Sequence, residues 1–144
     1  MYTDILLPTD GSAGTTEAIE HALAIATAHD ATIHVLYVVD RRHYMAAPAD
    51  AKAEIRTSLE SEATRAIEDA QEQIEAGGVS AVTQTDEGIP HRKIVEYAAE
   101  NTDMVVMGTH GKTGREQVAA LGSTTERVVE NSDVPVLVVN LTAE

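Results

Sequence analysis

The chain has 144 residues, a length typical of one domain, and 43% of them are hydrophobic. Ten Lys and Arg against 24 Asp and Glu give a formal net charge of −14, which disfavours nucleic acid and anionic membranes as partners. The absence of Cys excludes disulfides, thiolate metal sites and thiol nucleophiles. Because Phe and Trp are also absent, small aliphatic side chains must fill the core.

The negative charge has two interpretations. It can be a surface that keeps the protein soluble, or it can attract a specific cationic partner. A charge of this size also suggests a salt-rich cytoplasm, where screening weakens self-repulsion, as in a halophile. The amino terminus has no basic segment followed by an apolar one, and no apolar run approaches 18 residues. We therefore expect a cytoplasmic protein.

Five stretches rich in Val, Ile and Leu have the length of strands. They lie at Ile5–Leu7, Ile33–Val39, Val79–Thr83, Met104–Met107 and Val134–Val139. Between them, apolar side chains recur at helical spacing. This spacing predicts helices at residues 14–29, 52–76 and 90–101, and a fourth after Gly122. Gly77 and Gly78 should end the second helix.

The alternation of strands and helices predicts a single α/β domain over residues 1–144, with a parallel sheet between two layers of helices. Four strands are nearly continuous apolar runs, as expected of strands covered on both faces. The third alternates apolar and polar residues and is predicted at an edge. Residues 40–50 are predicted to form the longest connection, a mobile loop.

Ligands of open parallel sheets bind beyond the carboxyl ends of the strands, so the loops there are the most informative. The first loop runs through Pro8, Thr9, Asp10, Gly11 and Ser12 and then opens a helix. Asp10 could accept hydrogen bonds from a ribose or a base. It could equally cap the helix, and the sequence slightly favours capping.

The loop after the fourth strand is rich in glycine and contains two cations, Lys112 and Arg115. Gly108, Gly111 and Gly114 allow close approach of the backbone to an anion. Further along, Gly122 precedes a helix whose amino end favours phosphate. The alternative is a flexible surface loop.

Other chemistries find less support. Gly111-Lys112-Thr113 resembles the end of a P-loop, but Val106 stands where the P-loop needs its first glycine. The six His are scattered, with no zinc-binding spacing, so a metal site built by the protein is not expected. No group of Ser, His and acid residues can be assigned as a hydrolytic triad.

In order, these segments resemble the universal stress protein family over almost the whole length. The matching segments are residues 5–12, 34–40, 87–90, 105–111 and 134–139. The resemblance implies a three-layer sandwich, of the adenine nucleotide alpha hydrolase-like type, whose five parallel strands have the order 3-2-1-4-5. In that order the first and fourth strands are neighbours, and their loops converge.

The resemblance also implies a site for ATP with Mg²⁺ or Mn²⁺. Asp10 and Val38 would flank adenine and ribose, with Met107 and Gly108 lining the adenosine pocket. Phosphates would lie on Gly111, Gly122, Ser123 and Thr124, and the cation would bridge them. Pro8, Thr9, His110 and Arg115 complete the predicted nucleotide-binding residues. The family motif is Gly-x2-Gly-x9-Gly followed by Ser or Thr, whereas ten residues separate Gly111 from Gly122 here.

Three functions stay open at this stage. The first is an ATP-binding regulatory or protective stress protein that forms a homodimer through residues 136–139 of its apolar closing strand. The second is a dimeric interaction module that binds no nucleotide. The third is a weak ATPase or phosphotransferase using Lys112, Arg115 or His110, although no catalytic residues can be assigned.

Overall fold

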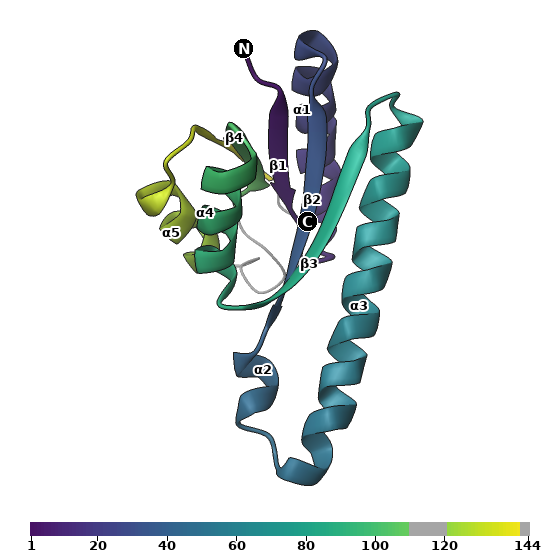
Figure 1. The fold of residues 1–144 in the computed structure, drawn as a ribbon, viewed down its shortest axis with the longest axis vertical. Coiled ribbons are helices and arrows are strands. Elements are labelled where there is room, and N and C mark those ends of the chain that lie inside the picture. The colour runs from purple at the N-terminus through teal and green to yellow at the C-terminus, as the bar shows by residue number, and fades with distance from the viewer. Residues whose placement is uncertain (110–120, 142–144) are drawn as a thin grey trace.

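The computed structural model describes residues 1–109 and 121–141. Five parallel strands form one sheet in the order β3-β2-β1-β4-β5, as predicted (Figure 1). The strands are β1 (Asp4–Pro8), β2 (Thr32–Asp40), β3 (Ala81–Gly88), β4 (Met104–Gly108) and β5 (Val136–Val139). All their carboxyl ends therefore lie at the same edge of the sheet.

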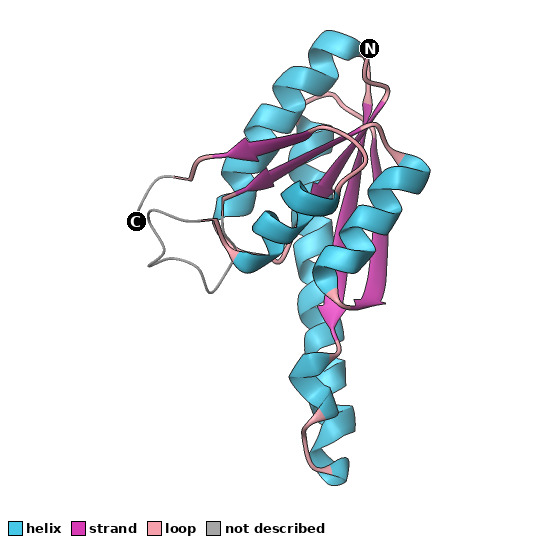
Figure 2. Cartoon of the chain, turned by 90° about the vertical axis from the view of Figure 1, so that its left-hand side faces the viewer, coloured by secondary structure: helices cyan, strands magenta, loops and turns pink. Residues whose placement is uncertain are grey.

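Helices cover both faces of the sheet, which gives the predicted three layers (Figure 2). They are α1 (Gly14–His29), α2 (Arg42–Met45), α3 (Ala49–Ala76), α4 (Pro90–Asn101) and α5 (Ser123–Asn131). α1 and α3 pack on one face, and α4 and α5 pack on the other. Gly77 caps α3, and Gly78 follows with a φ of 85°, so the predicted glycine stop is confirmed.

Alternating residues of the central strands divide the core into two parts. Ile5 and Leu7 of β1 face the α1 and α3 side, where they join Ile33, Val35 and the inner stripe of both helices. Leu6, between them, faces α4 and α5. All three β1 side chains are fully buried, which explains why the strand reads as a continuous apolar run.

Two predictions were wrong in detail. The third strand was expected at Val79–Thr83 but runs from Ala81 to Gly88. Its second half has no apolar side chains, yet it pairs with β2 up to Asp40 opposite Gly88, because backbone pairing at an edge does not require apolar side chains. Residues 40–50, expected to be a loop, contain helix α2 and the first two residues of α3.

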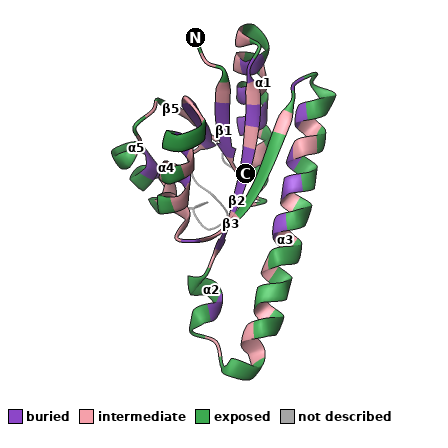
Figure 3. Ribbon diagram, viewed as in Figure 1, coloured by how far each residue is buried: buried purple, intermediate pink, exposed green. Residues whose placement is uncertain are grey.

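β2 extends beyond β1 at the carboxyl edge, and this step positions the candidate site. Pro8, the last residue of β1, pairs with Leu36, whereas β2 continues for four more residues alongside β3. α2 and the amino-terminal half of α3 project past the same edge (Figures 1 and 2). Most of this half of α3 is exposed, and its buried residues begin at Ala63 (Figure 3).

Candidate functional site

A cleft of about 570 Å³ lies at the carboxyl edge of the sheet, in the size range of small-molecule sites. The loop after β1, the end of β2, helix α2, the end of β4 and the start of α5 all contribute to it. Nine predicted residues line the cleft: Pro8, Thr9, Asp10, Val38, Met107, Gly108, Gly122, Ser123 and Thr124. The other three predicted residues, His110, Gly111 and Arg115, lie outside the described residues.

Side-chain hydrogen bonds shape the loop after β1. The Asp10 carboxylate accepts a hydrogen bond from the Ser12 backbone N–H at 2.9 Å, and Thr9 Oγ1 accepts one from Gly11 N–H at 3.1 Å. Thr9 Oγ1 also lies 3.0 Å from Thr15 Oγ1 on α1. In the described structure Ala13 is the N-cap of α1 and no side chain caps it, so the capping role favoured for Asp10 was wrong. Asp10 instead stabilises a turn that places its carboxylate in the cleft wall.

The amino end of α5 closes the opposite side of the cleft. Gly122 is its N-cap, and the Gly122 N–H donates to Thr109 O at 2.7 Å. The buried Thr125 hydroxyl donates to Gly108 O at 2.9 Å, which ties the first turn of α5 to the end of β4. Ser123 and Thr124 at this turn line the cleft. The positive end of the helix dipole therefore faces the cleft.

Gly108 allows the carboxyl-terminal segment to approach β4 closely. A Cβ at Gly108 would lie 2.8 Å from Leu141 Cδ1, closer than carbon atoms tolerate. Leu141 itself lines the cleft, and its backbone N–H lies 3.4 Å from Thr109 Oγ1. Sequence reasoning missed Leu141, because it follows the last strand rather than a glycine motif.

Val38 presents backbone as well as side chain to the cleft. Leu36 O accepts a hydrogen bond from Thr9 N–H at 2.9 Å, so the peptide groups of Leu36 point towards β1. Peptide groups two residues apart in a strand point the same way, so the peptide groups of Val38 also point towards the β1 side. Because β1 ends at Pro8, opposite Leu36, the Val38 peptide groups face the cleft rather than a neighbouring strand.

A charged group at the end of β2 was also missed. Asp40, Arg42 and His43 line the cleft mouth. Arg42 Nε and Nη2 donate to the two oxygens of Asp40 at 2.9 and 2.7 Å, and the Arg42 backbone N–H donates to Oδ1 at 3.0 Å. These hydrogen bonds lower the pKa of Asp40 and keep its carboxylate ionised. Asp40 was recognised only as the end of a matching segment, and its position after a strand was the signal that could have identified it.

Burial and neighbouring acids affect the tyrosine on the inner wall. Tyr37 is 7% exposed, and its pKa is raised mainly by this burial and further by the charges of Glu62 and Asp10. The phenol therefore stays protonated at neutral pH and keeps a hydrogen-bond donor at the cleft wall.

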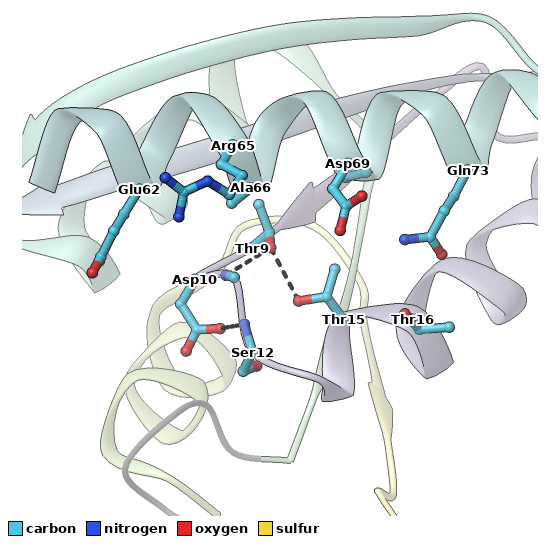
Figure 4. A pocket seen from close by; sticks show the side chains of 12 residues that line it. Thr9, Asp10, Ser12, Thr15, Thr16, Glu62, Arg65, Ala66, Asp69 and Gln73 are labelled. Atoms are coloured by element: carbon cyan, nitrogen blue, oxygen red, sulfur yellow. Dashed lines mark hydrogen bonds between the residues drawn. The ribbon is translucent and has the colours of Figure 1, made fainter.

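A smaller groove of about 270 Å³ branches from the cleft between the β1 loop and α3 (Figure 4). Glu62, Arg65, Asp69 and Gln73 of α3 face Thr15 and its neighbours across it. Arg65 and Asp69 are exposed, and the groove shares Asp10 and Glu62 with the cleft. Ala66 and Ala70 give the groove some apolar lining, but its walls are otherwise mostly polar, whereas the larger cleft also has Pro8, Val38 and Met107 in its lining.

Neither a metal cluster nor a membrane span is found in residues 1–109 and 121–141. Within these ranges no group of three or more His, Asp or Glu side chains could hold a metal ion. None of the helices described there is both long and apolar enough to cross a bilayer.

The profile of the Universal stress protein family matches residues 1–140. The chain belongs to the universal stress protein family. Universal stress protein MJ0531 of Methanocaldococcus jannaschii is 41% identical over 141 residues, covering 96% of this chain and 82% of the relative. The solved structure of MJ0577, from the same organism, is 34% identical with a TM-score of 0.90 and covers 100% of this chain and 99% of its own.

Two more distant universal stress proteins have nucleotide-bound structures. One, in complex with cAMP, is 21% identical with a TM-score of 0.74, covering 98% of this chain and 99% of its own. The other, from Arabidopsis thaliana with AMP bound, is 19% identical with a TM-score of 0.72, covering 98% and 93%. At these identities the likeness shows the shared universal stress protein fold.

Proposed function

We propose that this universal stress protein binds an adenine nucleotide, ATP with Mg²⁺ or Mn²⁺, in the cleft at the carboxyl edge of its sheet. Binding would serve a regulatory or protective role in the stress response of a cytoplasmic homodimer. Two relatives of the same fold are bound to AMP and cAMP, which supports an adenine nucleotide as the ligand class.

The observation that carries the proposal is the division of the cleft into two kinds of surface. Val38, Met107 and Pro8 supply apolar walls of the kind a base requires. Ser123 and Thr124 sit at the amino end of α5, where backbone N–H groups and the helix dipole favour phosphate. A molecule that is apolar and planar at one end and anionic at the other matches both.

The residues fit a divalent cation that comes with the nucleotide. In the described residues no protein cluster could hold a metal by itself, so phosphate oxygens would supply most of the ligands. The Ser123 and Thr124 hydroxyls at the cleft wall could complete the coordination. The cation would neutralise phosphate charge, which matters in a chain with a net charge of −14.

We propose binding rather than catalysis as the main task. The described cleft combines carboxylates, hydroxyls and a helix amino terminus with the His43 imidazole and the Arg42 guanidinium. The Arg42 guanidinium is held by the Asp40 carboxylate, and no group of this set is assigned as a general base. Slow hydrolysis through Lys112, Arg115 or His110 would be secondary.

Thermal melting of nucleotide-stripped protein in molar KCl, with and without Mg-ATP, tests the proposal. ATP at about 100 times its Kd should stabilise the fold by about 2.7 kcal/mol and raise the melting midpoint. The Gly111→Val and Gly122→Val double variant should lose this shift, because its new side chains would obstruct the phosphates.

Thr83→Val, on the exposed edge strand β3, is the control and should keep the full shift. If ATP leaves the midpoint of the folded wild-type protein unchanged, the nucleotide proposal fails and the non-nucleotide interaction module takes its place.

A further inference from the structure

Arg42 holds a fixed orientation at the cleft mouth. Its guanidinium forms a two-point pair with Asp40, and its backbone N–H also donates to the same carboxylate. The Asp40 side chain is only 12% exposed, whereas that of Arg42 is 63% exposed. The mostly covered carboxylate therefore acts as an anchor, and the guanidinium is the more exposed partner of the pair.

A guanidinium paired in this way keeps its flat faces available. The hydrogen bonds to Asp40 lie in the plane of the group, so they fix the plane without covering its faces. The entropy cost of ordering a long side chain has already been met before any ligand arrives. A planar cation held rigidly in this manner is suited to stack on an aromatic ring.

Few aromatic side chains line the described part of the cleft, so few other groups there could stack on a base. The chain has neither Phe nor Trp. Among the described lining residues the aromatic rings are those of Tyr37, which is buried in the core, and His43, beside Arg42. Val38 and Met107 offer an aliphatic surface within the same cleft, which leaves the outer face of a bound base to the residues of the mouth.

We propose that Arg42 stacks on the purine base of the bound nucleotide, and that Asp40 is the positioning residue that holds it in place. This inference rests on the proposed function and adds a base-selecting element to it. Purines, with their larger ring face, would be favoured over pyrimidines by this contact. The Arg42 guanidinium then contributes to binding through the stacking of its flat face on the base as well as through its positive charge.

Calorimetric titration of Mg-ATP and Mg-CTP into wild type, Arg42→Lys and Arg42→Ala, at low salt and in molar KCl, tests the proposal. Both variants should bind ATP about 5- to 30-fold more weakly in molar KCl, and their preference for ATP over CTP should shrink. Asp40→Asn alone should weaken ATP binding. Added to Arg42→Lys, the same substitution should weaken binding little further. Arg92→Lys and Arg92→Ala, at an exposed α4 residue that does not line the cleft, should bind as wild type does.

The outcomes separate the two proposals. If wild type binds ATP and Arg42→Lys binds equally well, or if the loss in Arg42→Ala disappears in molar KCl, Arg42 contributes charge only and the stacking proposal is overturned. If wild type binds no adenine nucleotide, the proposed function fails, and the stacking proposal fails with it. Melting of each ligand-free variant confirms that it is folded.

Discussion

Asp30 ends α1 in a conformation that few side chains adopt. Its φ and ψ are 58° and 47°, in the left-handed region, and its backbone N–H caps the helix at Ala26 O. Glycine usually occupies such a position, because a Cβ there is strained by about 1–2 kcal/mol. Asp30 also adds negative charge at the negative end of the helix dipole.

Asp30→Gly should therefore raise the free energy of unfolding by about 1 kcal/mol, measured by urea denaturation. Asp30→Asn is the control, because it removes the charge and keeps a side chain. If Asn stabilises as much as Gly, charge rather than backbone strain is the cause. If neither variant stabilises, the left-handed backbone carries no strain at this position.

Residue identity in the site was only partly predictable. Asp10 could be chosen because it follows an apolar strand, and the family resemblance implied Val38 and Met107; the cleft contains all three. Arg42 and His43 could not, because residues 40–50 lack apolar periodicity and were expected to be a loop. Their position depends on the pair between Arg42 and Asp40, a polar interaction that hydrophobic patterns do not report.

At the scale of elements, α2 and the first half of α3 form an arm that projects beyond the carboxyl edge of the sheet (Figure 1). Tyr44, 7% exposed, is the buried residue of α2 and belongs to the core cluster against which Ile55 and Leu59 of α3 pack. Arg56 of α3 lies over the Tyr44 ring, 5.6 Å from its centroid, and donates to Glu87 of β3 at 2.9 Å. Tyr44 therefore anchors the arm, and the arm carries Arg42 to the cleft.

Tyr44→Ala should destabilise the arm more than the sheet, because large-to-small changes of buried aromatic residues cost about 3–5 kcal/mol. Hydrogen exchange of residues 49–60 should accelerate, while β1 and β4 change little. Tyr44→Phe keeps the ring under Arg56 and should exchange as wild type does. Uniform acceleration across the sheet would show that the arm is not an independent unit.

Element types were more predictable than element ends. Helices 14–29 and 90–101 are confirmed as predicted, because amphipathic spacing and a proline at the start of α4 define them. The end of β3 could not be predicted, since residues 84–88 have no apolar side chains to signal a strand. Only their pairing with β2 makes them part of the sheet.

At the scale of the whole molecule, the two edges of the sheet differ in chemistry. The exposed residues of β3 run from Val82 to Thr85 and include Thr83 and Gln84. β5, at the other edge, consists of Val and Leu side chains that are mostly half-buried. An apolar strand at an open edge favours pairing with a second chain, so we expect β5 to form the proposed dimer interface.

Val138→Lys should place a charge at this edge and shift the protein from dimer to monomer, as sedimentation velocity would detect. Thr83→Lys, on β3, is the matched control and should leave the dimer intact. A wild-type protein that sediments as a monomer at high concentration would contradict the dimer itself. A Val138→Lys dimer would place the interface elsewhere.

The strand order was predicted from family resemblance, and the layers followed from the alternation of elements. The cleft volume was not predictable, because it depends on how far β2 and β3 extend beyond β1, which is a matter of register between strands distant in sequence.

Because β2 extends four residues beyond β1, the size of the cleft and the stability of the core depend on different parts of the sheet. The buried part of the core lies where all strands overlap, whereas the cleft occupies the space beyond Pro8 that a longer β1 would fill. Adding or removing residues at strand ends would therefore make the cavity deeper or shallower without repacking the interior. In this architecture the length of one strand relative to its neighbour sets how large a molecule can be held.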